Sequence, residues 1–172
     1  NPIKATTYGT GQLMRAALDE GATSLVIGLG GSATNDGGIG MACAFGYQFL
    51  TEGGDELVSP IDLVHLDRIL PPTTGLPESC LILVDVTAPL LGPLGATAVF
   101  GPQKGVDTDT ATQLEAGLER LADIVSRDLG TDHRETPGAG AAGGLGFGLL
   151  AFCNAEIVPG FEYICKRIGL DT

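Results

Sequence analysis

A glycine-rich stretch between residues 24 and 38 carries residue types suited to binding an anion. It runs Ser-Leu-Val-Ile-Gly-Leu-Gly-Gly-Ser-Ala-Thr-Asn-Asp-Gly-Gly, a short β-branched run followed by glycines and small polar residues. Glycines let the backbone approach a ligand closely, and amides between a strand and a helix can bind an anion. The alternative is an ordinary tight turn, for which Asn-Asp-Gly-Gly is also suited. The predicted substrate-binding residues are Gly30, Gly31, Ser32, Thr34, Asn35 and Gly37.

Three charged residues are the candidates for catalysis. Asp36 lies within the glycine-rich stretch, and Asp85 lies near the end of an apolar run that begins at Cys80. Lys104 lies in Gly-Pro-Gln-Lys-Gly, where it can contact a phosphate or a carboxylate as a point charge. Asp36 and Asp85 are also the candidate magnesium ligands. The sequence leaves open which Asp holds metal and which positions the attacking hydroxyl, and also the plainer roles of a turn-forming Asp85 and a solvated Lys104.

The elements that must position these residues predict an α/β fold. The apolar run at 25–27 and the run that begins at Cys80 are typical of buried strands in a parallel sheet. Apolar spacing over 108–129 predicts a long amphipathic helix, whose Glu115, Glu119, Arg120 and Arg127 should form a solvated face. We expect a mixed, largely parallel sheet flanked by helices, in a single α/β domain spanning residues 1–172.

Shorter elements complete this prediction. Helices are expected over 10–18 and 39–45, and residues 47–50 should pair with 56–58 as a hairpin. A further glycine cluster at 136–152 permits close packing, or close approach of a ligand to the start of a helix.

Composition and charge exclude several classes of partner. The net charge of −12 argues against binding to nucleic acid or to an anionic membrane surface. An anionic substrate therefore needs positive potential that is made locally, by amides, a few Lys or Arg residues, or a metal ion. The four cysteines lack metal-ligand spacing and are typical of reduced cytosolic thiols. With no signal peptide or membrane-length apolar run in this sequence, we expect a cytoplasmic location.

Three segments together resemble bacterial glycerate kinases of the first type. They are residues 27–38, 84–105 and 138–148, and the opening Ala-Thr-Thr-Tyr-Gly-Thr-Gly at 5–11 is similar to that family as well. The resemblance implies ATP-dependent phosphorylation of D-glycerate with Mg²⁺, giving 2-phosphoglycerate. It therefore also implies an organic acid phosphorylation in glyoxylate metabolism.

The resemblance also implies that this chain is one domain of a longer, two-domain kinase. Its parts would be a glycine-loop core at 24–46, a strand and lysine loop at 80–105, and a glycine-rich helix start at 136–152. Its partners would be D-glycerate, ATP and the remainder of the kinase chain, with a homodimer left open. We expect the 172-residue chain alone to be inactive, because phosphoryl transfer requires both substrates to be positioned away from water.

Two other classes of function stay open. Gly28, Gly30 and Ala33 fit the spacing G-x-G-x-x-A after a strand, with Glu52 near the distance expected for a ribose contact. That pattern would indicate an NAD-dependent oxidoreductase. The other alternative is a non-catalytic module that binds a small anion.

Overall fold

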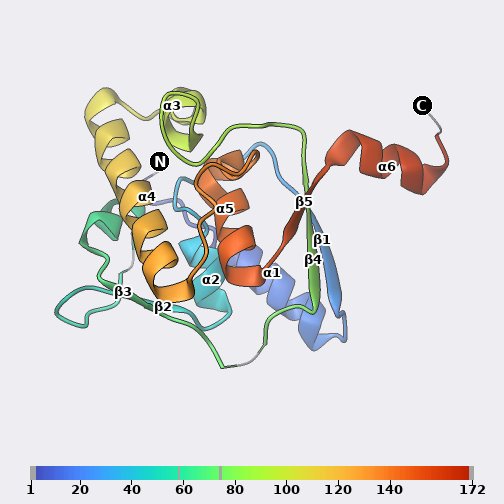
Figure 1. Cartoon of the computed structure of the whole chain (residues 1–172), viewed down its shortest axis with the longest axis horizontal. Coiled ribbons are helices and arrows are strands. Elements are labelled where there is room, and N and C mark those ends of the chain that lie inside the picture. Colours follow the sequence, from blue (N-terminus) through green and yellow to red (C-terminus); the bar gives the residue numbers. More distant parts are fainter. Residues whose placement is uncertain (1–2, 58, 74, 171–172) are drawn as a thin grey trace.

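A three-stranded parallel sheet lies at the centre of the computed structural model, which describes residues 3–57, 59–73 and 75–170 (Figure 1). Its strands are β1 (Ser24–Gly28), β4 (Ser79–Val84) and β5 (Glu156–Pro159), in the order β1-β4-β5. All three strands run in the same direction. Their carboxyl ends therefore meet at one edge, where ligands bind in open α/β sheets. The predicted α/β class and the largely parallel sheet are confirmed.

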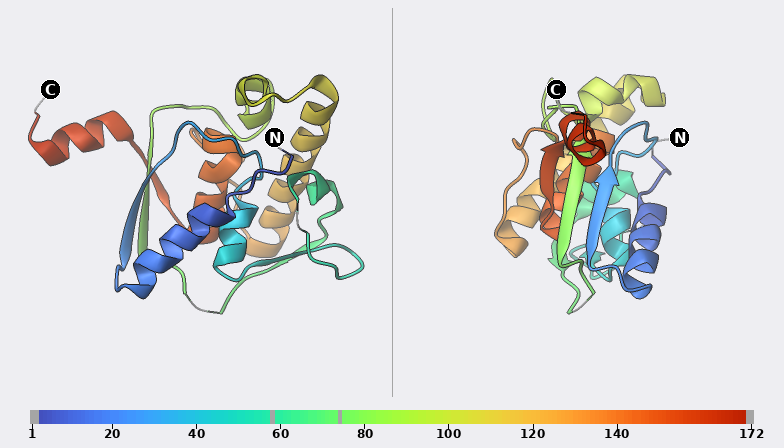
Figure 2. Two further views of the ribbon diagram at one scale, coloured as in Figure 1. Left: turned by 180° about the vertical axis from the view of Figure 1, so that it is seen from behind. Right: turned by 90° about the vertical axis from the view of Figure 1, so that its right-hand side faces the viewer.

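Helices cover one side of this sheet. The helices are α1 (Tyr8–Asp19), α2 (Ile39–Ala44), α3 (Ala96–Phe100), α4 (Thr108–Leu129), α5 (Ala141–Cys153) and α6 (Gly160–Ile168), with the 3₁₀ turns η1 (Pro60–His65) and η2 (Pro102–Lys104). Figures 1 and 2 show α1 to α5 on the same side of the sheet, whereas α6 projects away from the body. The right-hand view of Figure 2 looks directly onto the other face of the strands.

That other face is apolar and only partly covered. Along β4, Cys80, Ile82 and Val84 are buried towards the helices, whereas the residues between them are half-buried. Val26 in β1 is 51% exposed, so the prediction that the 25–27 run is wholly buried is wrong in the described structure. Parallel sheets normally have both faces covered. The exposed face is therefore one that a further layer of structure would stabilise.

The predicted hairpin is only partly formed, and a second, two-stranded sheet supplies the main pairing. β2 (Gln48–Leu50) pairs antiparallel with β3 (Arg68–Leu70). The predicted partner segment contributes a bridge between Leu50 and Glu56 and a hydrogen bond from the amide of Leu57 to the carbonyl oxygen of Phe49 at 2.9 Å, and residue 58 lies outside the described residues. The hairpin was predicted from a nearby glycine turn, but β3, the strand that pairs with β2, lies later in the chain.

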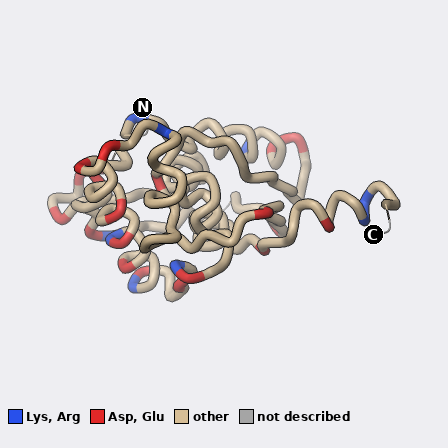
Figure 3. The backbone as a smooth tube through the Cα atoms, turned by 90° about the horizontal axis from the view of Figure 1, so that it is seen from above, with Lys and Arg blue, Asp and Glu red and all other residues tan. Residues whose placement is uncertain are grey.

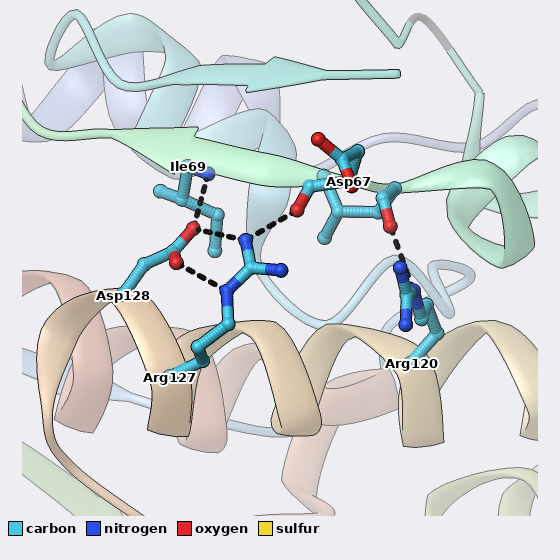
Figure 4. Close-up of polar contacts among 6 residues, drawn as sticks. Asp67, Ile69, Arg120, Arg127 and Asp128 are labelled. Atoms are coloured by element: carbon cyan, nitrogen blue, oxygen red, sulfur yellow. Dashed lines mark hydrogen bonds and ion pairs between the residues drawn. The ribbon is translucent and has the colours of Figure 1, made fainter. Parts of the chain in front are cut away.

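Side chains of α4 hold β3 in place (Figure 4). Arg120 Nε donates to the carbonyl oxygen of Leu66 at 2.7 Å, and Arg127 donates to the carbonyl oxygen of Asp67. The amide of Ile69 donates to Asp128 Oδ2 at 2.8 Å. The predicted bounds of α4 and the exposure of Arg127 are confirmed, whereas the prediction of a solvated side chain is wrong for the half-buried Arg120. Both guanidinium groups bond backbone carbonyls that precede the strand.

Helix α4 also forms the middle of the hydrophobic core. It begins after Asp107, whose side chain accepts a hydrogen bond from the amide of Thr110 at 2.8 Å, as expected for an N-cap. Its Leu118, Leu121 and Val125 are completely buried.

Acidic residues outnumber basic residues in this chain. Asp and Glu positions are spread along the tube in Figure 3, whereas Lys and Arg positions are few. None of the helices in the described residues combines the length and the hydrophobicity needed to cross a bilayer.

Candidate active site

A cavity of about 150 Å³ lies at the carboxyl edge of the sheet, between three segments that are far apart in sequence. The segments are the glycine loop after β1, the α3–η2 segment, and the start of α5. The cavity is lined by Leu29, Gly30, Gly31, Ser32, Val86, Phe100, Gln103, Lys104, Ala141 and Ala142. Lys104 is the one charged residue in this lining. The arrangement is therefore suited to an anion.

Lys104 is fixed to the glycine loop by a direct hydrogen bond. Its Nζ donates to the carbonyl oxygen of Thr34 at 2.7 Å. The side chain is half-buried, and burial lowers the pKa of Lys104, while the negative charge of Asp36 acts in the opposite direction. An anion that approaches this lysine would favour its charged form.

The first glycines of the loop border open space. A Cβ atom built at Gly28, Gly30 or Gly31 would meet nothing within 4 Å. Gly31 also has a φ of +59°, which disfavours other residues there. Internal packing therefore does not explain why Gly28 and Gly30 lack side chains. Close approach of a ligand to the backbone would explain it at Gly30, which lines the cavity.

The last glycines of the loop instead pack against the start of α5. The amide of Gly37 donates to the carbonyl oxygen of Gly143 at 3.1 Å, and Thr34 Oγ1 donates to that of Ala142 at 3.2 Å. A Cβ on Gly143 would lie 1.9 Å from the carbonyl oxygen of Thr34. Only glycine permits this contact between two backbones. Gly37, predicted to bind substrate, lies in this packed part of the loop.

The start of α5 has an unusual backbone. Ala142, Gly143 and Gly144 all have positive φ, with Ala142 at φ 53° and ψ 40°. A left-handed alanine is strained by about 1–2 kcal/mol. Ala142 lines the cavity, so the strained residue lies at the candidate site. The sequence prediction of a glycine-rich helix start missed this kink, although the neighbouring glycines were its signal.

Ser32 and Asn35 carry buried polar atoms without partners. Among the described residues, neither Ser32 Oγ nor Asn35 Oδ1 has a hydrogen-bond partner. Asn35 is 1% exposed, and its Nδ2 donates to Thr97 Oγ1 of α3 at 3.1 Å. Buried polar atoms without partners are uncommon and point to a ligand or ordered water. Ser32 lines the cavity and Asn35 connects the loop to α3 behind it.

Asp36 lies behind the loop and is completely buried. Its carboxylate accepts hydrogen bonds from the amide and hydroxyl of Thr7, each at 2.8 Å, and from the amides of Gly38 at 3.0 Å and Gly40 at 3.3 Å. It therefore caps the start of α2 and holds the segment before α1. It does not line the 150 Å³ cavity. It borders a separate one of about 290 Å³ beside α2.

Asp85 lies at the sheet edge but on the outer face. It follows Val84, is exposed, and its Oδ1 accepts a hydrogen bond from the amide of Phe161 at 3.0 Å. The amide of Leu29 bonds the carbonyl oxygen of Leu83, so Asp85 lies along the same edge as the glycine loop. Asp36 and Asp85 thus lie on different sides of this loop. Among the described residues, no three His, Cys, Asp or Glu side chains are grouped to hold a metal ion.

The structure thus brings together only part of the predicted site. Gly30, Gly31, Ser32 and Lys104 line one cavity, with the Thr34 carbonyl holding the lysine. Asn35, Asp36 and Gly37 support the loop from behind. Sequence reasoning missed the apolar lining from Val86 and Phe100, for which no residue type gives a signal. Ala141 and Ala142 lie in the 136–152 cluster, where close approach of a ligand was one of the two predictions.

The spacing that suggested dinucleotide binding lacks its structural setting. In that fold, the acidic residue follows a second strand of the parallel sheet. Here Glu52 follows β2, which belongs to the separate antiparallel sheet.

Comparison with known proteins identifies the family. The model of the "Glycerate kinase family" matches residues 1–172. The chain belongs to the glycerate kinase family. It is 43% identical to glycerate kinase of Bacillus subtilis (strain 168), covering all of this chain and 46% of that protein. It is 40% identical to glycerate 2-kinase of Escherichia coli (strain K12), covering 99% of this chain and 46% of that protein.

A solved structure in the glycerate kinase family has the same fold. It is a crystal structure assigned provisionally as glycerate kinase 2 from Salmonella typhimurium LT2, with a TM-score of 0.91 and 41% identity. The match covers 98% of this chain and 46% of that one. The chain thus spans about half the length of the curated relatives that it matches.

Proposed function

We propose that this chain supplies part of the active site of a cytoplasmic, ATP-dependent kinase that converts D-glycerate to 2-phosphoglycerate. Family membership supports phosphorylation of glycerate, and kinase chemistry implies ATP. One structural observation carries the assignment to this site. Lys104, the unpartnered hydroxyl of Ser32 and two glycines with open space before them line a single cavity free of carboxylates.

The residues around this cavity have different roles in the proposal. Lys104 supplies positive charge to a substrate carboxylate or a phosphate, and Ser32 donates a hydrogen bond to it. Gly30 and Gly31 allow the ligand to approach the backbone. Because these groups are held before the ligand arrives, they stabilise the transferring group without reorganising.

The two aspartates are assigned to different tasks. Asp36 is a positioning residue, because its oxygens already accept hydrogen bonds from Thr7, Gly38 and Gly40. Asp85 is an exposed carboxylate that immediately precedes Val86, a residue of the cavity lining. Magnesium is commonly held by one or two carboxylates together with substrate phosphates and water. Asp85 fits that requirement as a single contact, and the metal would supply charge stabilisation to the phosphates.

The remainder of the site belongs to a further domain in this proposal. The relatives are about twice as long, and the outer face of the sheet is apolar and exposed at Val26. A second domain packed on or beside this face would enclose the open side of the cavity. Exclusion of water strengthens the contacts of Lys104 and of a metal ion.

A coupled assay of ATP consumption with D-glycerate and Mg²⁺ tests the proposal. We expect turnover at roughly 1–100 s⁻¹ by a full-length protein that contains this chain, and none by the 172-residue chain. Turnover by the short chain at that rate would show that the whole site lies within these residues. A full-length protein with no activity on D-glycerate would contradict the proposed substrate.

A further inference from the structure

A second and larger cavity, of about 530 Å³, lies between α3 and α4. Its walls are built mainly from small apolar side chains, and its residues include Pro93, Ala98, Ala111 and Ala116. Small side chains on two helices leave open space between them. Largely apolar walls with a few polar groups are typical of sites for an organic ring.

Two carboxylates line this cavity, the exposed Glu119 and the partly buried Glu115, and Glu115 has an oxygen left over. Glu115 Oε1 accepts a hydrogen bond from the amide of Gly92 at 2.6 Å. Its other oxygen, Oε2, is buried and has no donor among the described residues. A buried carboxylate oxygen without a donor is costly. The last torsion of a glutamate is soft, so a small rotation would present Oε2 to a ligand N–H group in the cavity.

The cavity is connected to the anion site through α3. Thr97 lines it and accepts the hydrogen bond from Asn35 Nδ2 at 3.1 Å. Phe100, at the other end of α3, lines the Lys104 cavity. Helix α3 has 5 residues, which corresponds to a length of about 7.5 Å. An extended nucleoside triphosphate is longer than that, so its base and its phosphates could occupy the two cavities together.

We infer that the α3–α4 cavity binds the adenine base of ATP, with the exocyclic amine donating to Glu115. This inference rests on the proposed function, because it places the nucleotide of the same reaction. Only one oxygen of Glu115 remains for a ligand, since Gly92 occupies the other. Adenine presents a single amine at this edge. Guanine would present two adjacent donors, which need both oxygens, and hypoxanthine would present a carbonyl oxygen that the carboxylate repels.

The variant Glu115→Gln tests this pairing, because it should shift the nucleotide preference from ATP towards ITP. Its amide oxygen can still accept from Gly92, while its NH₂ group can donate to the carbonyl of hypoxanthine. We expect the wild-type protein to prefer ATP to ITP by about 10- to 100-fold, the size of one hydrogen bond to a charged group. In Glu115→Gln that preference should fall by at least about tenfold, because ATP binds more weakly and ITP more tightly.

Two measurements on a full-length protein containing this chain give the result. One is the ratio of kcat/KM for ATP and ITP, and the other is the ratio of their dissociation constants by calorimetry. Glu52→Gln, an exposed turn residue outside both cavities, is the matched control and should leave both ratios unchanged. If Glu115→Gln is poorly folded, Ala98→Phe fills the cavity from an exposed position. It should raise KM for ATP more than tenfold with little change in kcat.

The possible failures are distinguishable. Unchanged ATP:ITP ratios in a folded Glu115→Gln, or a wild-type preference for GTP, would overturn the adenine assignment while leaving glycerate phosphorylation intact. An unchanged KM for ATP in Ala98→Phe would do the same. A protein that binds and uses no nucleotide at all would overturn both this inference and the proposed function.

Discussion

The ammonium group of Lys104 donates to the carbonyl oxygen of Thr34 at 2.7 Å, joining two segments 70 residues apart in sequence. One of these segments follows β1, and the other is the 3₁₀ turn η2 after α3. Because the bond uses only one of the three ammonium protons, the lysine can hold the loop and still contact an anion.

The pH dependence of anion binding should follow the protonation of Lys104. Burial lowers its pKa below 10.5, and only the protonated form attracts an anion. D-glycerate keeps one negative charge above pH 5. We therefore expect its affinity to be constant at pH values below the lowered pKa and to fall as the pH rises through it. Lys104→Gln should bind at least about tenfold more weakly near pH 7, the size of one hydrogen bond to a charged group, and should show no such fall. A wild-type affinity that stays level up to pH 10.5 would contradict the role of this lysine.

Gly30→Ala tests whether Gly30 is needed for close approach of a ligand and not for packing of the protein. A Cβ at Gly30 meets nothing within 4 Å and Gly30 does not have a positive φ, so the free energy of unfolding should change by less than about 1 kcal/mol. D-glycerate binding should nevertheless weaken at least about tenfold, since the methyl group enters the ligand's space. Gly9→Ala in α1 is the control, because its Cβ also meets open space. Equal glycerate affinity in both variants would remove Gly30 from the binding site.

The main effect of Asp36→Asn should be on the free energy of unfolding and not directly on kcat. The new NH₂ group would face the amide and hydroxyl of Thr7, which donate to the carboxylate. Leaving buried donors unpaired costs about 1–3 kcal/mol for each group. Urea unfolding of Asp36→Asn and of the exposed control Asp55→Asn measures the difference. A variant that keeps its stability but loses kcat would return Asp36 to a direct catalytic role.

Stability should fall in alkaline solution because of buried thiols. Burial raises the pKa of Cys80 from 9.0 to about 11 and that of Cys153 to about 12. Between pH 9 and these values the unfolded chain loses thiol protons that the folded chain retains. Their contribution is complete below pH 9 and is lost as the pH rises through the folded values. Thermal unfolding from pH 8 to 11 should show this decline, and Cys80→Ala should reduce its slope. A Tm that is independent of pH over this range would be inconsistent with buried thiols.

Val26→Asp tests whether a further domain covers the sheet. Val26 is 51% exposed on the outer face, so the substitution should change the stability of the 172-residue chain by less than about 1 kcal/mol. In a full-length protein, a covered position would lose several kcal/mol through burial of an unpaired charge. Leu76→Asp, at an exposed loop residue, is the control. Equal effects of Val26→Asp in both proteins would argue against a domain on this face.

Sequence patterns predicted the elements whose stabilisation is local. Helix α4 was placed to the residue, because apolar spacing and an acidic N-cap specify both its face and its start. Strands β1 and β4 were recognised from their β-branched and aliphatic runs. β5 was missed, because its four residues, Glu156–Pro159, include a charge and a proline and are a strand only through pairing with β4.

The candidate site was likewise predicted only in part. Residue type pointed to Lys104, Ser32 and the open glycines, which line one cavity. The same reasoning grouped Asp36 with Asp85, although one is a buried cap and the other lies on the outer face. Sequence cannot separate these cases, because an aspartate after a strand serves equally as a ligand or as a cap.

The strand order β1-β4-β5 has a consequence for synthesis of this protein on the ribosome. β1 ends at Gly28, whereas its partner β4 ends at Val84, with one helix, a 3₁₀ turn and a separate sheet formed between them. At a translation rate of roughly 5–20 residues per second, β1 waits on the order of 3–10 s for β4 to appear. Its unpaired apolar edge is then exposed to other nascent chains and chaperones. Slowing translation over residues 28–84 should therefore increase aggregation more than slowing it afterwards.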